Sequence, residues 1–168
     1  MPAPIDLHTH STVSDGTEAP AEVIAAAARA GLGAIALTDH DSTAGWAEAS
    51  EAVRGTGMLF VPGIELSTQL NYASVHVLGY LPDARHPRLV AEMAAIREER
   101  LTRAESMVRR IAADYALSWD DVLAQTTPGA TIGRPHIADA LVARGHVPNR
   151  SAAFATILHW QGGYYRPH

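Results

Sequence analysis

The stretch Ile5-Asp6-Leu7-His8-Thr9-His10 lies near the start of the chain, and Ser14-Asp15-Gly16 follows it closely. Successive side chains of a strand point to opposite faces, so His8 and His10 point the same way, about 7 Å apart along the strand. Two imidazoles at this spacing can grip one metal ion between them. From the turn that ends at Gly16, the Asp15 carboxylate can fold back over the same ion or reach a second one. The pair alone can equally be two solvated histidines.

The composition favours one α/β domain with a core of its own. Hydrophobic residues make up 47% of the 168 residues but aromatic residues only 6%, a balance typical of alanine-rich helices packed on a sheet. Because the chain contains no cysteine, any metal must be held by histidine, aspartate and glutamate. Those ligands favour Zn²⁺, Mn²⁺ or Fe²⁺.

Charge and hydropathy narrow the class of partner. The formal net charge of −5 argues against broad electrostatic binding to nucleic acid. It leaves room for a phosphorylated small molecule, because bound divalent cations reverse the sign of a site locally. No apolar run reaches the roughly 18 residues of a membrane span, and the residues before the first expected strand contain no basic segment with an apolar stretch. We therefore expect a cytoplasmic protein with no membrane partner.

Hydrophobic periodicity predicts four strands and two helices in the first half of the chain. The strands are expected at residues 5–10, 34–38, 58–61 and 74–78. The first helix begins at a Thr17 cap and ends at Gly31, and the second begins at Asp41 or Ser42 and ends before Gly55. Strand, helix and strand at this spacing form a parallel unit, so we expect a parallel sheet.

Candidate metal ligands recur at or near the C-terminal end of each expected strand. They are His8, His10, His40, Glu65 and His76. In parallel α/β folds, the loops at that edge of the sheet build the ligand site. Considered singly, His40 can be a surface-loop residue, His76 a satisfied core histidine and Glu65 a strand-end charge. Taken together with Asp15, they predict a site for several metal ions.

The order of these motifs resembles the opening of the PHP (polymerase and histidinol phosphatase) family. The matching motifs span residues 4–80 and are His8-Thr9-His10, Asp15-Gly16, Thr38-Asp39-His40-Asp41, Gly63-Ile64-Glu65 and Val75-His76-Val77. The resemblance implies a distorted (β/α)₇ barrel, of which this chain holds the first four strands, with a trinuclear metal site that hydrolyses phosphoesters. It also implies the ligands: His8 and His10 for the first metal, Glu65 bridging to a second that His76 holds, and Asp15 and His40 for the third.

The second half of the chain reads as helical. We expect residues 1–81 to form the N-terminal part of the barrel and residues 82–168 a helical insertion or lid subdomain. The helices are expected to begin at Pro87, after Ser118, at Gly133-Arg134-Pro135-His136 and at about residue 151, the last of them running to about 159. Arg134 and the free N–H groups of its helix can share one phosphate, and His136 can hydrogen-bond the same group. Arg134 can equally be a solvated charge and His136 an ordinary first-turn residue.

This insertion resembles the PHP branch that dephosphorylates nucleotides, such as adenosine monophosphate (AMP) and 3′,5′-nucleoside bisphosphates, and that degrades short RNA. Members of the branch continue with an Ala-His-Pro motif and a Ser-Asp-x-His motif, and this sequence contains neither. We therefore expect a chain without its C-terminal half. It would be a fragment of a longer enzyme or a half that needs a partner chain.

The leading hypothesis is a metal-dependent phosphoesterase that hydrolyses phosphomonoesters of nucleotides through a metal-bound hydroxide. It would use up to three divalent ions of Mn²⁺, Zn²⁺ or Fe²⁺. The expected substrate is AMP or a 3′,5′-nucleoside bisphosphate, with short RNA ends as a further class and duplex DNA excluded. The alternative is a non-catalytic metal-binding module, suggested by the missing ligand motifs.

Overall fold

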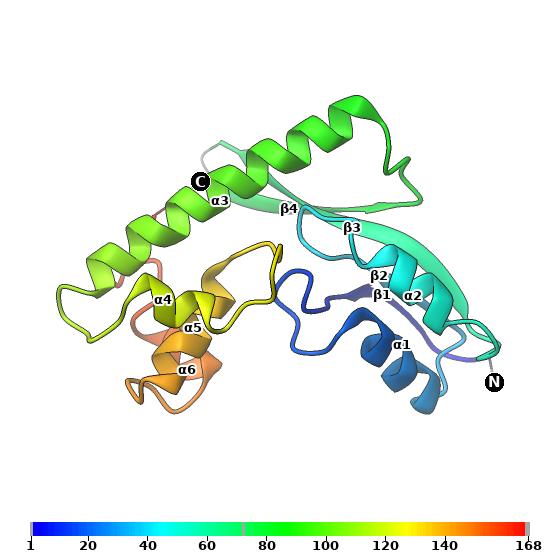
Figure 1. Ribbon diagram of the computed structural model, residues 1–168, viewed down its shortest axis with the longest axis horizontal. Helices are drawn as coiled ribbons and strands as arrows, with labels where there is room; N and C mark the ends of the chain where they lie inside the picture. The colour runs from blue at the N-terminus through cyan, green and yellow to red at the C-terminus, as the bar shows by residue number, and fades with distance from the viewer. Residues whose placement is uncertain (1, 72, 167–168) are drawn as a thin grey trace.

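A curled four-stranded sheet forms one half of the structure, a computed structural model that describes residues 2–71 and 73–166 (Figure 1). The strands lie across the sheet in chain order and are β1 (Ile5–Thr9), β2 (Ala34–Leu37), β3 (Leu59–Leu70) and β4 (Ala73–Tyr80). The α/β class and the half-barrel form of the sheet are confirmed.

Helices α1 (Pro20–Arg29) and α2 (Trp46–Ala52) pack on each other and against this sheet. The buried residues of this core are Val23, Ile24, Ala27, Ile35, Leu37, Ala49 and Met58. Every residue of β2 is buried, because the strand lies between β1 and β3 and is covered by the helices. A strand in this central position is covered on both faces, and this explains why the apolar run of β2 is continuous.

The parallel arrangement predicted for all four strands is wrong for β4. The first three strands are parallel, but β4 pairs with β3 in the antiparallel sense, with His76 opposite Ser67. The connection from Leu70 to Ala73 is so short that it can join only antiparallel strands. Asn71, at a φ of 49°, has the left-handed backbone that a tight hairpin turn uses. His76 therefore reaches the site from the middle of a strand and not from its C-terminal end.

The start of α1 also differs from the prediction. The helix begins at Pro20 with Ala19 as its cap, and not after Thr17. Glu22 reaches back and accepts a hydrogen bond from the Ala19 N–H at 2.8 Å. This contact stabilises the first turn without a hydroxyl group at the cap.

The predicted start of α2 is wrong because Asp41 has another role. The helix begins after Gly45, while the buried Asp41 carboxylate accepts hydrogen bonds from the N–H and hydroxyl groups of Ser67, at 2.8 and 2.7 Å. The same carboxylate pairs with Arg100 of α3 (Pro87–Ile111), with Nε 3.0 Å from Oδ2. Asp41 thus joins the end of β2 to β3 and to the long helix.

The helical half of the chain is organised along α3. Its other helices are α4 (Trp119–Leu123), α5 (Arg134–Ala143) and α6 (Arg150–Ala155). The capping box predicted at Ser118 is confirmed at the start of α4, whereas α6 ends earlier than the predicted residue 159 because Thr156 leaves the helical conformation. None of the helices in the described ranges combines the length and the hydropathy that crossing a membrane requires.

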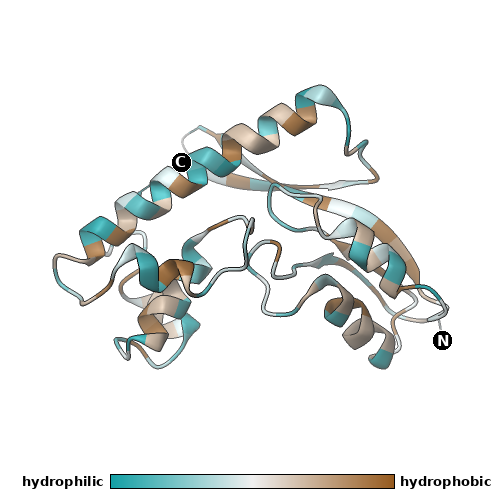
Figure 2. Ribbon diagram, viewed as in Figure 1, coloured by the Kyte–Doolittle hydropathy of each residue, from teal (hydrophilic) through white to brown (hydrophobic). Residues whose placement is uncertain are grey.

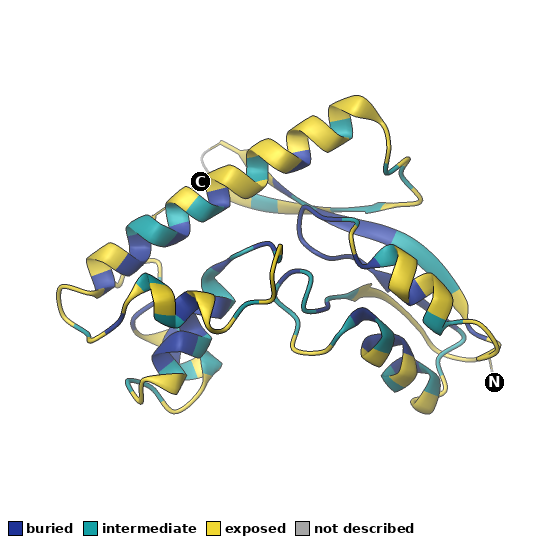
Figure 3. Ribbon diagram, in the orientation of Figure 1, coloured by how far each residue is buried: buried dark blue, intermediate teal, exposed yellow. Residues whose placement is uncertain are grey.

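The two halves have separate hydrophobic cores, with no residue in common. Figure 3 shows that α5 and the facing side of the last turns of α3 are buried, whereas the first turns of α3 are mostly exposed. The helix thus belongs to the helical core at one end and runs beside the sheet at the other (Figure 1). The boundary predicted between residues 81 and 82 stays a prediction.

Part of the sheet carries exposed apolar side chains. They include Ile5, Leu7, Leu59, Leu70, Val77 and Tyr80. Figure 2 shows hydrophobic segments along β3, beside the helices that cover only part of the sheet. A four-stranded sheet cannot close into a barrel, so such a bare surface is the expected result.

Removing one partner of the buried Arg100–Asp41 pair should destabilise the fold strongly. We expect Arg100→Met to lower the free energy of unfolding by about 3 kcal/mol or more, because the Asp41 charge is then left buried without its partner. The control is Arg54→Met, which removes an exposed pair with Glu51 at 3.1 Å and should change little. Urea unfolding of the 168-residue chain measures both variants. Equal losses in the two variants would contradict the prediction.

Candidate metal centre

Glu65 lies at the centre of the six predicted metal ligands. Its side chain is only 6% exposed, and its two oxygens meet histidines from both edges of the sheet. Oε2 lies 2.7 Å from His8 Nε2 and 3.0 Å from His10 Nε2. Oε1 lies 2.5 Å from Nδ1 of His76 on β4. One carboxylate therefore gathers side chains from the first and the last strand.

A second carboxylate, Asp15, adjoins this centre from the loop after β1. Its Oδ1 lies 3.4 Å from His10 Nδ1, and its Oδ2 lies 3.5 Å from His40 Nε2. The same nitrogen of His40 lies 3.9 Å from Glu65 Oε2. His10 and His40 thus link the two carboxylates, and the structure brings all six predicted ligands into one cluster.

Asp39 holds the loop after β1 in place. Its buried carboxylate accepts hydrogen bonds from the N–H and hydroxyl groups of Ser11 and from the hydroxyl of Ser14, each at 2.7 Å. Gly16 closes the turn where a Cβ would lie 2.4 Å from the His10 carbonyl oxygen, so a larger residue would force the backbone apart. The sequence analysis did not predict this role of Asp39. The one indication in the sequence was its position between Thr38 and His40 of the same motif.

The pKa shifts of three cluster members, His10, Asp15 and Glu65, favour the protonation states that bind metal. Burial lowers the pKa of His10, and the charge of His40 acts in the same direction. Burial raises the pKa of Asp15, but the nearby His40 and the charges of His10 and Arg100 together outweigh burial, so the pKa lies below its ordinary value. The pKa of Glu65 is lowered in the same way, with hydrogen bonds from neighbouring histidines outweighing burial. Neutral imidazoles and ionised carboxylates are the ligand forms that metals need.

The donor set fits divalent metal ions. Three groups each hold ligand atoms within 4.8 Å of one another: His8, His10 and Glu65; His10, Asp15 and His40; and His40, Glu65 and His76. Neighbouring imidazole centroids are 4.8 to 5.1 Å apart, so protonating every ring would bring like charges together. Nδ1 of His40 is buried without a hydrogen-bond partner among residues 2–71 and 73–166. Contacts within the protein therefore do not satisfy the cluster.

A cavity of about 110 Å³ opens beside the cluster. The predicted ligands Asp15, His40 and His76 line it, together with Arg100, Arg103 and Arg134. The Arg134 guanidinium stacks on two aromatic rings, 5.4 Å from the centroid of Phe154 and 5.3 Å from that of Tyr165. Such stacking limits the directions that the planar guanidinium can take.

Arg100 and Arg103 were not predicted as site residues. They lie three residues apart on α3, and that spacing, which puts two side chains on one helix face, was the available signal. Burial lowers the pKa of Arg103 to about 10, and the charges of Arg100 and Arg134 act in the same direction. In the part of the chain that the structure describes, no carboxylate forms an ion pair with Arg103 or Arg134. The cavity therefore suits an anion.

Comparison with known proteins gives the family. The profile of the PHP domain matches residues 6–127, which is more than half of the chain and contains all six predicted ligands. The chain belongs to the PHP domain family. The fold expected from the sequence motifs and the family match therefore agree.

Relatives of this PHP domain include nucleotide and RNA enzymes. It is 40% identical over 157 residues to a 3′,5′-nucleoside bisphosphate phosphatase of Chromobacterium violaceum, over 93% of this chain and 55% of that protein. It is 33% identical over 156 residues to a 5′-3′ exoribonuclease of Haemophilus influenzae, over 91% of this chain and 56% of that protein. The chain spans about half the length of these relatives.

A solved structure resembles the PHP domain over nearly its whole length. It comes from Bifidobacterium adolescentis and is assigned as a metal-dependent phosphoesterase. The TM-score is 0.94 at 43% sequence identity, over 99% of this chain and 59% of the other. The half-barrel and the helical half therefore recur together in a related protein.

His136, the other predicted substrate residue, is buried in the first turn of α5. Its Nδ1 accepts a hydrogen bond from the Gly133 N–H at 3.1 Å. His136 is not part of the lining of the arginine cavity. The structure thus places Arg134 beside the histidine and carboxylate cluster and His136 in the buried turn that begins α5.

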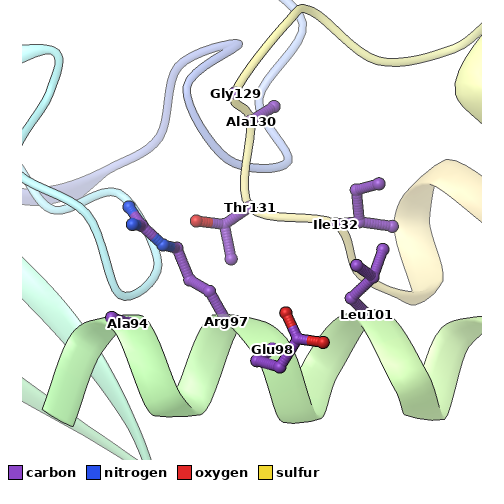
Figure 4. Close-up of a pocket in the computed structure, with 8 residues that line it drawn as sticks. All are labelled: Ala94, Arg97, Glu98, Leu101, Gly129, Ala130, Thr131 and Ile132. Atoms are coloured by element: carbon purple, nitrogen blue, oxygen red, sulfur yellow. The ribbon is translucent and has the colours of Figure 1, made fainter. Parts of the chain in front are cut away.

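A second hollow, of about 350 Å³, lies between α3 and the loop of residues 129–132 (Figure 4). Arg97 and Glu98 extend from the helix and Thr131 from the loop. None of the predicted metal ligands lines this hollow. The Thr131 N–H donates a hydrogen bond to the Val13 carbonyl at 2.9 Å, so the loop also contacts the segment that follows β1.

His136 should make stability depend on pH. Burial lowers its pKa from 6.5, so the unfolded chain holds this proton more tightly than the folded chain. The stability from the neutral ring is therefore complete above about pH 6.5 and is lost as the pH falls through the lowered pKa. We expect His136→Asn, whose side-chain oxygen can accept the Gly133 N–H, to lose less unfolding free energy than the unsubstituted chain between about pH 7 and about pH 5. Urea unfolding at both pH values measures the difference, and equal losses would contradict the prediction.

Proposed function

We propose that this chain is the metal-binding part of a phosphoesterase that hydrolyses phosphomonoesters of nucleotides, such as AMP or a 3′,5′-nucleoside bisphosphate. The observation that carries the proposal is the cavity that joins three arginines to the histidine and carboxylate cluster. A phosphate in this cavity can contact guanidinium groups on one side while its oxygens face the metal ligands on the other. The reaction then needs no nucleophilic side chain.

The ligand assignment follows the three groups of the cluster. In the proposal, His8 and His10 hold the first ion, Glu65 bridges it to a second that His76 holds, and Asp15 and His40 hold the third. Nitrogen and oxygen donors without a thiolate suit Mn²⁺, Zn²⁺ or Fe²⁺. Bound ions of this kind supply Lewis acidity and lower the pKa of coordinated water.

Arg134 is the proposed phosphate-binding side chain. A guanidinium presents planar pairs of N–H donors that match the oxygens of a phosphate, and stacking on Phe154 and Tyr165 orients the plane before the substrate arrives. Arg103 adds a second, partly desolvated charge in the same cavity. His136 supports phosphate binding indirectly. It accepts a hydrogen bond from Gly133 and so fixes the start of α5, the helix that carries Arg134. The positive charges of Arg134 and Arg103 stabilise the negative charge that develops on the phosphoryl oxygens.

A terminal phosphate suits this site better than an internal diester. A phosphomonoester carries close to two negative charges at neutral pH, whereas a diester carries one and has bulk on both sides. The similarity to the nucleoside bisphosphate phosphatase of C. violaceum supports nucleotides as substrates. The similarity to the exoribonuclease of H. influenzae supports short RNA ends as a further class. The helical half stands beside the small cavity, so the proposal excludes duplex DNA.

Glu65→Gln should remove metal and activity together. The amide keeps the shape of the carboxylate but loses its charge and one acceptor oxygen, so we expect metal affinity to fall about 100-fold or more, at least as much as when a residue that only orients a ligand is lost. Glu51→Gln, which changes an exposed side chain of α2, is the matched control and should change neither the metal affinity nor the activity. Metal analysis after incubation with Mn²⁺, together with phosphate release from AMP and from adenosine 3′,5′-bisphosphate, measures both properties.

Two outcomes of that experiment would count against the proposal. Turnover by Glu65→Gln at the unsubstituted rate would show that the cluster is not the catalytic centre. Metal binding by the unsubstituted chain without any turnover would favour the alternative, a metal-binding module or a half that acts only with a partner chain.

Arg134→Ala should raise KM for a nucleoside monophosphate about 10-fold or more, because a charged, two-point contact to phosphate is lost. The metal content should stay unchanged, since all six proposed ligands remain. Arg29→Ala, which removes an exposed charge from the last turn of α1, is the control. An unchanged kcat/KM would make Arg134 a surface charge, and a loss of metal would make it a support of the cluster.

A further inference from the structure

Residues of the helical half form hydrogen bonds with the loop that carries Asp15. Hydrogen bonds reach the backbone of this loop: Thr127 Oγ1 donates to the Thr12 carbonyl at 2.7 Å, the Thr131 N–H to the Val13 carbonyl at 2.9 Å, and Arg150 Nη1 to the Asp15 carbonyl at 3.3 Å. A proposed metal ligand of the sheet half is thus held by residues more than 100 positions later in the chain.

Arg150 has a defined direction because Asp139 holds it. The guanidinium meets the Asp139 carboxylate through two nitrogens, Nε to Oδ1 at 2.5 Å and Nη2 to Oδ2. This leaves Nη1 as the nitrogen that faces the Asp15 carbonyl. Since a guanidinium is planar, fixing two of its nitrogens also fixes the direction of the third.

Asp15 depends on this contact more than its neighbours do. Asp39 accepts hydrogen bonds from Ser11 and Ser14, but within residues 2–71 and 73–166 only Arg150 makes a hydrogen bond to the backbone of Asp15. The Asp15 carboxylate itself lies 3.4 and 3.5 Å from its histidine neighbours, outside the range of short hydrogen bonds. The position of the Asp15 backbone therefore decides where the carboxylate lies.

We propose that Asp139 and Arg150 form a positioning pair that fixes the Asp15 backbone and so completes the metal group of His10, Asp15 and His40. The pair touches no proposed substrate or metal and acts only through Asp15. The inference rests on the proposed metal centre, and it makes one metal ion depend on the helical half of the chain. The groups that contain Glu65 do not share this dependence, because Glu65 lies on β3.

A calorimetric titration of the metal-free 168-residue chain with Mn²⁺ tests the proposal. Each metal site that binds with its own affinity gives a separate binding phase. Asp15→Asn identifies the binding phase that needs Asp15, and His8→Asn identifies the phase that needs the first group. Arg150→Met keeps an unbranched, flexible side chain but has no hydrogen-bond donor. We expect it to weaken the Asp15 phase about 10-fold, the scale seen when a partner of a metal ligand is lost, and to leave the His8 phase unchanged.

The matched control is Arg144→Met. Arg144 also contacts a backbone carbonyl, that of Ala116 at 3.2 Å, and an acidic side chain, Asp121 at 3.8 Å, but it does so away from the metal loop. This variant should leave both phases unchanged. Asp139→Asn should weaken the Asp15 phase, and the double variant Asp139→Asn/Arg150→Met should weaken it no further than Arg150→Met alone, because the two residues act as one unit.

The outcomes separate this inference from the proposed function. If Asp15→Asn leaves every binding phase unchanged, the metal centre itself is wrong. If Asp15→Asn removes a phase but Arg150→Met behaves like Arg144→Met, only the positioning pair is wrong. Should circular dichroism show that Arg150→Met does not fold, Asp139→Asn gives the decision, and an unchanged Asp15 phase in that variant overturns the proposal.

Discussion

The arrangement of the site depends on the contact of one buried carboxylate, that of Glu65, with histidines on both edges of the sheet. Its backbone is fixed by the segment after β2, where the Asp41 N–H donates to the Glu65 carbonyl at 3.0 Å. Its side chain reaches His8 on β1 and His76 on β4. The strand that carries it pairs in parallel with β2 and then, further along, antiparallel with β4. Glu65 lies near the point where the pairing of β3 changes from parallel to antiparallel. Histidines from β1 and from β4 can therefore both reach its side chain.

Among the residues that the structure describes, polar contacts join the two halves of the molecule, and their apolar cores stay separate. The hydrophobic clusters under the sheet and around α5 have no residue in common. Arg100 pairs with Asp41, and Arg150 pairs with Asp139 while it contacts the loop of Asp15. Directional contacts of this kind set angles and distances more narrowly than apolar packing does. They therefore suit a joint on which the geometry of a metal cluster depends.

The charge of the site is opposite to that of the whole chain. The net charge is −5, yet Arg100, Arg103 and Arg134 share one small cavity beside the histidines. A cavity wall of low dielectric strengthens their field there, so the local potential and not the net charge decides which ligand is attracted. Total composition is an average over the surface and contains no information about such a concentration of charge.

Local patterns in the sequence determined much of this protein. The alternation of His8 and His10, the apolar run of β2, the Ser118 cap and the proline at the start of α3 each depend on near neighbours in the chain. Spacing along the chain is therefore enough to predict them. The order of the motifs likewise predicted that the six candidate ligands would meet, and the assignment of ions to them stays a prediction.

Only the tertiary structure decided the contacts between distant segments. The antiparallel direction of β4, the use of Asp41 by Ser67 and Arg100, and the approach of Arg150 to Asp15 all depend on the path of the backbone. A carboxylate such as Asp41 can cap a helix or accept hydrogen bonds from another strand, and the residues next to it are the same in both cases. Which of the two occurs depends on what the folded chain brings within about 3 Å of it, and that information lies in no single stretch of sequence.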